Sequence, residues 1–218
     1  DYIKLIDPRM DGFNDAVIQG NLELDNSILN INAQVPSFSY DGKQFNNINL
    51  LGNGNKDTLH ANIDVGNIKI SDSLSFPETK LVLAASNDNT KIQLLTRAGK
   101  ILNDAELNAT VQTLSDGVKI HFFPSSFVIN NNKWLLEKDG ELTVRKRFID
   151  ADEVRFKSGQ QEIVISTLFD DLTDGTHLVA KLKNVVIEDF TPFFISDPKL
   201  AGILTGTATL RNPFEKPI

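Results

Sequence analysis

The sequence predicts an all-β fold built from a long antiparallel sheet. Three observations support this. Apolar and polar residues alternate with a period of two along most of the 218 residues, and helical periodicity is nearly absent. Short turns separate the strand-like runs, which leaves no crossover long enough for parallel strands. We therefore expect at least a dozen strands in one β-rich segment that spans residues 1–218.

The first half of the chain contains several strand-like runs. Ala16–Leu24 is the first, and Leu29–Val35 alternates clearly until Pro36, which is expected to end that strand. Asp41-Gly42 is a strong hairpin signal because both residues accept the positive φ of a tight turn. Leu59–Val65 places four apolar residues on one face and polar residues on the other. The apolar residues thus fall on a single side of the predicted sheet.

The second half continues the pattern. Asp104–Thr113 is the clearest strand, and Asp116-Gly117 is expected to turn it into the next one. Trp134–Glu137 and Glu141–Val144 are two further short strands, joined by Asp139-Gly140. Periodicity alone does not separate a closed β-sandwich from an open, curved sheet, since both have strands with one apolar face.

The stretch Leu178–Leu210 contains a strand, a bend with two prolines and a second strand. Leu178, Ala180 and Leu182 form the apolar side of the first strand. A short helix over Phe190–Ile195 is possible in the bend, with Asp189 as its cap and a proline in the first turn.

Composition narrows the functional classes. The net charge of −7 argues against nucleic-acid binding, which requires a basic face. The absence of cysteine excludes disulfides and cysteine zinc sites. No apolar run approaches the roughly 20 residues of a membrane-spanning helix.

Residues with catalytic potential are sparse. His60, His121 and His177 have no metal-ligand spacing, and no nucleophile-elbow motif occurs. The first two are expected on the polar, solvated side of their strands. The acidic turn at Asp170–Asp174 lacks the pattern of a calcium loop, and a solvated turn is expected there. We expect no enzymatic activity, no metal and no cofactor.

The C-terminal third resembles the TamB family of AsmA-like envelope proteins, known as translocation and assembly modules. The residues that carry the resemblance are Trp134-Leu135-Leu136, Val154–Ile163, Leu178–Val186, the proline bend Phe190–Pro198 and Leu200–Leu210. They cover about a third of the chain. The sequence departs from the family pattern at Thr207–Thr209, which is more polar than usual, and it contains no membrane anchor.

The resemblance implies a U-shaped trough, or β-taco, with an apolar concave face. It also implies a location in the periplasm of a Gram-negative envelope, in a parent protein anchored in the inner membrane. The implied ligands are phospholipid acyl chains carried between the inner and outer membranes, and the implied partner is an outer-membrane β-barrel that acts in outer-membrane biogenesis. No nucleic acid is expected as a partner.

The apolar sides of the clearest strands supply the candidate groove lining. Its members are Leu59, Ala61, Ile63, Val65, Ala105, Leu107, Ala109, Val111, Val118, Ile120, Phe122, Leu178, Ala180 and Leu182. The alternative is a closed β-sandwich, such as an adhesion or carbohydrate-binding module of a surface protein. An aspartate at Ile63 or Leu107 distinguishes the two, because it would unfold a sealed core but only interrupt an open groove.

Overall fold

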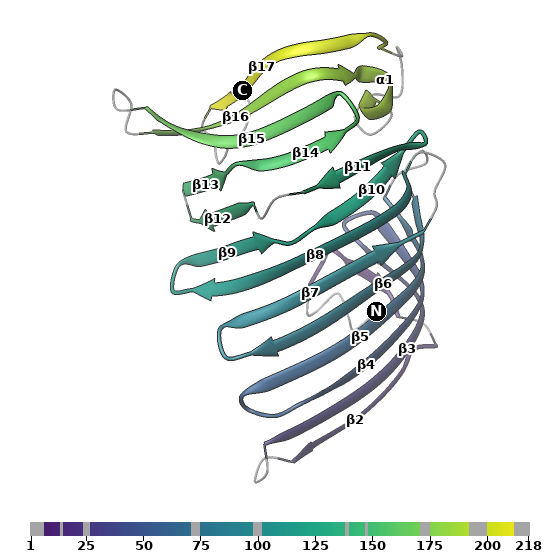
Figure 1. The fold of residues 1–218 in the computed structure, drawn as a ribbon. Coiled ribbons are helices and arrows are strands. Elements are labelled where there is room, and N and C mark those ends of the chain that lie inside the picture. Colours follow the sequence, from purple (N-terminus) through teal and green to yellow (C-terminus); the bar gives the residue numbers. More distant parts are fainter. Residues whose placement is uncertain are drawn as a thin grey trace. The chain divides into compact units, whose positions relative to one another are not determined.

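The computed structural model shows an all-β protein (Figure 1). It describes residues 7–13, 15–23, 27–70, 75–97, 102–137, 140–146, 148–170, 175–191 and 200–211. The described strands form an antiparallel sheet of 17 strands that does not close on itself. The predicted long antiparallel sheet is therefore confirmed, and the closed β-sandwich is wrong because no second sheet covers the first in the described chain.

Two compact units divide the chain, Asp1–Glu106 (unit 1) and Leu107–Ile218 (unit 2). The strands of unit 1 are β1 (Met10–Gly12), β2 (Val17–Glu23), β3 (Ile28–Tyr40), β4 (Lys43–Gly54), β5 (Thr58–Lys69), β6 (Ser75–Ser86) and β7 (Asn89–Thr96). From β2 to β7 each strand pairs antiparallel with the next one in the chain. The predicted Asp41-Gly42 hairpin joins β3 to β4, with φ of 50° and 76° at its two turn residues.

A row of four residues crosses unit 1 at the point where the alternation of apolar and polar side chains along each strand shifts by one residue. Pro36, Asn47, Gly66 and Glu78 lie opposite one another on β3 to β6, and we call them the inversion row. Asn47 and Glu78 have positive φ, of 53° and 47°. A Cβ on Gly66 would lie 3.0 Å from the Asn47 Cβ, so the row favours a glycine there.

The inversion row corrects one sequence expectation. Pro36 does not end its strand, because β3 continues to Tyr40. Proline lacks an N–H, and it is tolerated here because the local backbone is irregular. Beyond the row, Phe38, Phe45 and Ile68 pack against the cluster of Val35, Ile48 and Val65, so the apolar side continues across it.

Unit 2 contains most of β8 (Leu102–Leu114) and the strands that follow. These are β9 (Gly117–Phe122), β10 (Ser125–Ile129), β11 (Asn132–Leu136), β12 (Glu141–Arg145), β13 (Phe148–Asp152), β14 (Val154–Ser158), β15 (Gln161–Asp170), β16 (Gly175–Val186) and β17 (Ile203–Arg211). The predicted turn at Asp116-Gly117 is displaced by one residue, because Leu114 pairs with Gly117 across Ser115-Asp116.

At three places in the sheet of unit 2, two short strands lie end to end where a single long strand would be expected. β11 pairs with β10 and β14, whereas β12 pairs with β9 and β13. The two segments joined through Asp139-Gly140 therefore follow one another along the sheet and do not pair with each other. In the same way, β9 and β10 form one interrupted strand, and β13 and β14 form another. This arrangement preserves a simple meander through unit 2.

A threonine hydroxyl links β13 to β15. The Thr167 Oγ1 accepts a hydrogen bond from the Ala151 N–H at 2.8 Å and donates one to the Ile149 carbonyl at 3.2 Å. The hydroxyl thus satisfies an N–H and a carbonyl of β13 that would otherwise need backbone partners from a neighbouring strand. Phe148 stacks on Phe169 at 6.0 Å between ring centroids and packs the same two strands together.

The helix in the bend is shorter and earlier than predicted. α1 spans Ile187–Phe190, and Asp189 lies inside it instead of capping it. Val186 occupies the cap position and makes no side-chain capping bond. The rest of the predicted helix lies outside the described residues, apart from Thr191.

Candidate apolar binding surface

Unit 1 carries rows of apolar side chains that run across its strands. Directly paired residues of an antiparallel sheet project from the same face, so the strand register defines these rows. One row contains Ile18, Ala33, Leu50, Ile63, Leu81 and Leu94. A second contains Gly20, Ile31, Gly52, Ala61, Leu83 and Ile92. Each row crosses six strands without a charged side chain.

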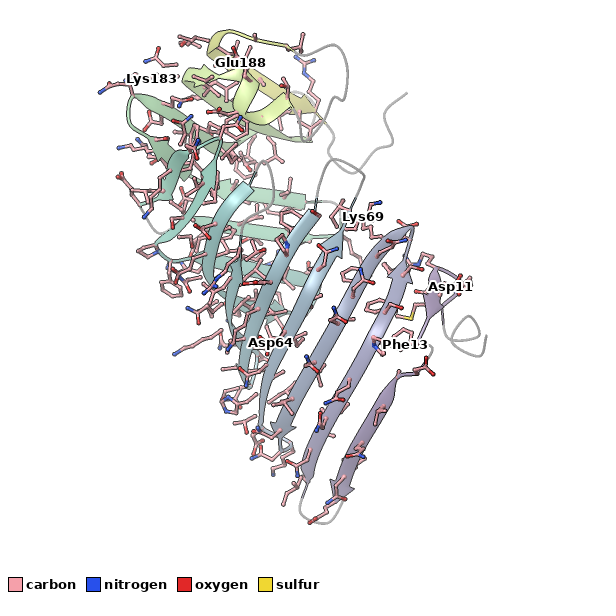
Figure 2. All side chains as sticks on the ribbon, turned by 90° about the vertical axis from the view of Figure 1, so that its right-hand side faces the viewer. Asp11, Phe13, Asp64, Lys69, Lys183 and Glu188 are labelled. Atoms are coloured by element: carbon pink, nitrogen blue, oxygen red, sulfur yellow. The ribbon has the colours of Figure 1, made fainter. Side chains whose placement is uncertain are left out.

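This apolar face is covered at one end and open at the other. Next to the inversion row, Val35, Ile48 and Val65 are buried under the rings of Phe13, Phe38 and Phe45. Phe38 stacks on Phe45 with 4.7 Å between ring centroids, and it contacts the tilted ring of Phe13 at 5.0 Å. Figure 2 labels Phe13 just after β1. Toward the far ends of the strands, Leu22 and Leu59 are exposed, and Leu22 reaches 63%. Ile18, on the edge strand β2 and nearer the inversion row, is exposed as well.

The covered end also contains two buried hydroxyls. Thr79 and Thr96 continue the row of Val35, Ile48 and Val65, and their Oγ1 atoms lie 3.0 Å apart. The Thr96 hydroxyl also donates to the Pro77 carbonyl at 3.3 Å. These polar groups therefore satisfy each other within an apolar row.

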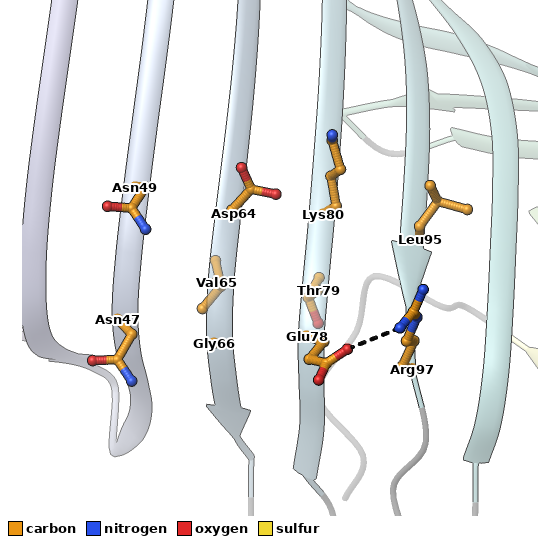
Figure 3. Close-up of a pocket in the computed structure, with 10 residues that line it drawn as sticks. All are labelled: Asn47, Asn49, Asp64, Val65, Gly66, Glu78, Thr79, Lys80, Leu95 and Arg97. Atoms are coloured by element: carbon orange, nitrogen blue, oxygen red, sulfur yellow. Dashed lines mark hydrogen bonds and ion pairs between the residues drawn. The ribbon is translucent and has the colours of Figure 1, made fainter.

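The opposite face of unit 1 is mostly polar, although Val17 and Leu51 are exposed on it. Asn49, Asp64 and Lys80 lie beside one another there, and near the inversion row Glu78 pairs with Arg97 at 3.4 Å (Figure 3). These residues line a shallow hollow of about 520 Å³. The hollow contains exposed charges of both signs, so it favours neither a cationic nor an anionic ligand.

Unit 2 brings together the predicted lining residues of β8 and β9. Ala109 lies opposite Phe122, Val111 opposite Ile120, and Val118 opposite Thr113. Leu142 and Val144 of β12 extend the last two rows across β9. Leu107 and, in unit 1, Ala105 lie on the same side of β8 by alternation and are half-buried.

The predicted residues of β16 also share one face with their neighbours. Leu178, Ala180 and Leu182 lie opposite Leu210, Ala208 and Gly206 of β17. On the other side, Ala180 and Leu182 lie opposite Ile165 and Ile163 of β15. The reverse face of β16 is partly covered too, because Val179 on that face is only 2% exposed. β13 contacts both β15 and β16, which explains some of this burial.

Aromatic residues and α1 cover one end of this apolar face. Trp134 is completely buried, lies 5.3 Å from Phe190 of α1 and stacks on Phe127 at 6.3 Å. Asp189 of α1 is 3% exposed. Its carboxylate accepts hydrogen bonds from Asn130 Nδ2 at 3.2 Å and Asn132 Nδ2 at 2.9 Å. These two bonds anchor α1 to the turn between β10 and β11.

Sequence reasoning missed many members of the two apolar faces. The missed residues include Ile48, Leu50, Leu81, Leu83, Ile92 and Leu94 in unit 1, and Trp134, Leu136, Val154, Phe156, Ile163 and Ile165 in unit 2. Their alternation is visible in the sequence, but their membership depends on register. The pairing across strands is what joins them to the predicted residues.

Among the residues that the structure describes, no group of three or more His, Asp or Glu side chains could hold a metal ion. His60 is exposed, as predicted, and His121 is half-buried beside Glu141. The possible calcium turn at Asp170–Asp174 lies largely outside the described residues. Within the described ranges, no helix is long and apolar enough to cross a membrane.

Glu141 is the centre of a small charged group on β9 and β12. Its carboxylate lies 2.7 Å from Lys119 Nζ and 3.3 Å from His121 Nδ1. The hydrogen bond from Lys119 is the main cause that lowers the pKa of Glu141, and His121 contributes in the same direction. The ionised carboxylate is thus favoured in the folded state.

We expect this group to add to the loss of stability at acid pH. A carboxylate with a lowered folded-state pKa stabilises fully above its unfolded pKa of about 4.3, and the contribution disappears as pH falls through the folded pKa. Glu141→Gln should therefore lose less stability than the wild type between pH 6 and pH 3, by up to about 1 kcal/mol for such an exposed pair. Urea unfolding at both pH values measures this difference. Lys119→Met should likewise lose less stability than the wild type between pH 6 and pH 3. If both variants show the pH dependence of the wild type, the Glu141 group does not contribute to the loss of stability at acid pH.

No family model, curated protein or solved structure matches the chain.

Proposed function

We propose that the apolar faces of this protein bind phospholipid acyl chains in a U-shaped trough of the TamB type. The observation that carries the proposal is the open part of the unit 1 face, where Ile18, Leu22 and Leu59 are exposed beside continuous apolar rows. Soluble proteins seldom expose contiguous apolar surface unless it binds a partner, a ligand or a membrane. The resemblance of the C-terminal third to TamB supports lipid as that ligand.

The dimensions of a row suit an acyl chain. Six strands separated by about 4.8 Å give a row of about 24 Å. An acyl chain in a bilayer spans about half of the ~30 Å hydrocarbon core. One row can therefore accommodate a whole acyl chain lying across the strands.

The chemistry of the rows also suits a mobile ligand. Each buried methylene contributes about 0.8 kcal/mol without any directional contact. Because Ile63, Leu81 and Leu94 provide no hydrogen-bonding groups, a chain can slide along their row without breaking polar contacts. Bound headgroups would remain in solvent. The role proposed for the parent protein is transfer of phospholipid across the periplasm in support of outer-membrane biogenesis.

A photo-crosslinking pair on β5 tests the proposal. Benzoylphenylalanine at Ile63, on the apolar face, is expected to capture phospholipid from vesicles, and mass spectrometry of the adduct identifies the lipid. The same label at Asn62, on the opposite face of the same strand, is the matched control and should capture far less. Equal capture at the two positions, or none at Ile63 in a folded protein, would refute acyl-chain binding by this face. A second label at Leu107 extends the test to unit 2.

A further inference from the structure

Strand β17 has an open backbone edge in the described chain. Its nine residues pair with β16, and no other described strand contacts it extensively. All nine are exposed, and the exposed fraction of Ile203 is 72%. Figure 1 shows β17 as the outermost strand of unit 2. Its outward N–H and C=O groups can accept a further strand.

The sequence of β17 lacks the features that normally protect an edge strand. Ile203–Leu210 contains no charged residue and no proline, and Arg211 is the first charge. The other long edge strand, β2, carries Glu23, and Asn21 donates a hydrogen bond to it at 2.9 Å. Of these two edges, β17 is therefore the better template for pairing.

We propose that the partner of β17 is β17 of a second copy of this chain. An antiparallel pair centred on Thr207 aligns all nine residues of the two strands. Leu204 then lies opposite Leu210 of the second copy, and Thr205 lies opposite its Thr209. Thr207 meets its own equivalent at the two-fold axis. Leucine faces leucine and every threonine faces a threonine, and threonine pairs of this kind stabilise antiparallel sheets. Gly206 faces Ala208, and these small residues introduce no clash or unpaired charge.

The two-fold axis of this pair is perpendicular to the sheet. The apolar faces of both copies therefore remain on the same side, and the rows that end at Ala208 and Gly206 continue into the second copy. Lys181 and Lys183 of β16 do not oppose the pairing strongly. Three strand spacings separate them from their equivalents, about 14 Å, which exceeds the Debye length of about 8 Å at physiological ionic strength.

Single cysteines test this pairing directly, because the chain has no cysteine of its own. Thr207→Cys is expected to form a disulfide-linked dimer on mild oxidation, since directly opposed residues have Cα atoms about 4.5–5.5 Å apart. Thr205→Cys alone should not crosslink, because its equivalent is four residues away along the strand, about 13 Å. A mixture of Thr205→Cys and Thr209→Cys chains should crosslink as a heterodimer.

Two controls complete the design. Asn62→Cys, exposed on the polar face of β5, measures random collision, and Thr207→Cys should crosslink about tenfold faster or more because its thiols are held together. Thr207→Lys should convert the dimer to a monomer in light scattering, because like charges that lie directly opposite each other at the two-fold axis destabilise the pair. A monomeric wild type at high concentration, or crosslinking at Gly20→Cys of β2 instead of Thr207→Cys, would overturn the proposal. Neither result depends on lipid binding.

Discussion

Val65→Asp is expected to unfold unit 1, whereas Leu59→Asp should leave it folded. Both residues lie on the same face of β5, but Val65 is buried in the cluster under the phenylalanine rings and Leu59 is exposed. A charge buried without a partner costs several kcal/mol, which is comparable to the 5–15 kcal/mol stability of a whole domain. An aspartate at an exposed position costs about 0.5 kcal/mol.

Hydrogen exchange monitored by mass spectrometry distinguishes these outcomes. Peptides from β4, β5 and β6 should lose protection in Val65→Asp and retain it in Leu59→Asp. Asn62→Asp adds the same charge to the polar face and serves as the control for net charge. If Leu59→Asp unfolds unit 1 as completely as Val65→Asp does, the far end of the apolar face is closed and cannot receive a ligand.

Leu136→Ala is expected to destabilise unit 2 by about 2–5 kcal/mol. Leu136 is 1% exposed and lies opposite Phe156, two residues after the buried Trp134. Truncation to alanine leaves a cavity at the end of the sheet that α1 covers, and the surrounding rings can fill it only partly. The urea midpoint should fall by about 1–3 M.

Trp134 provides the measurement for this variant. It is the single tryptophan of the chain and is completely buried, so its emission reports the unfolding of unit 2. Leu168→Ala removes the same side chain from an exposed position on β15 and should change the free energy of unfolding by less than about 1 kcal/mol. A similar midpoint for both variants would show that the Trp134 region is not a packed core.

The sequence was sufficient to predict the strands, several turns and the apolar side of each clear strand. Alternation from Leu59 to Val65 and from Ala105 to Val111 is a local property, and the structure retains it. The inversion row was also visible as a step of three residues between Val35 and Phe38. Pro36 nevertheless predicts a strand end by local rules, because proline usually interrupts a ladder.

Other features depend on contacts between distant residues. β11 pairs with β14 and β12 pairs with β9, and periodicity carries no information about these choices. Asp189 was expected to cap a helix, but its partners are Asn130 and Asn132, more than 50 residues earlier in the chain. Local capping rules cannot anticipate such partners, and the same limit applies to the burial of Trp134.

The chain-neighbour pairing of β2 to β7 also has a consequence for folding and for evolution. Since each strand pairs with the strand before and after it, contact order in unit 1 is set by hairpins, and the sheet can form by successive addition of strands. Insertion or deletion of a whole hairpin would change the length of the sheet by about 9.5 Å while preserving strand polarity and the identity of each face. A fold of this kind can adjust its span by duplication without redesigning its core.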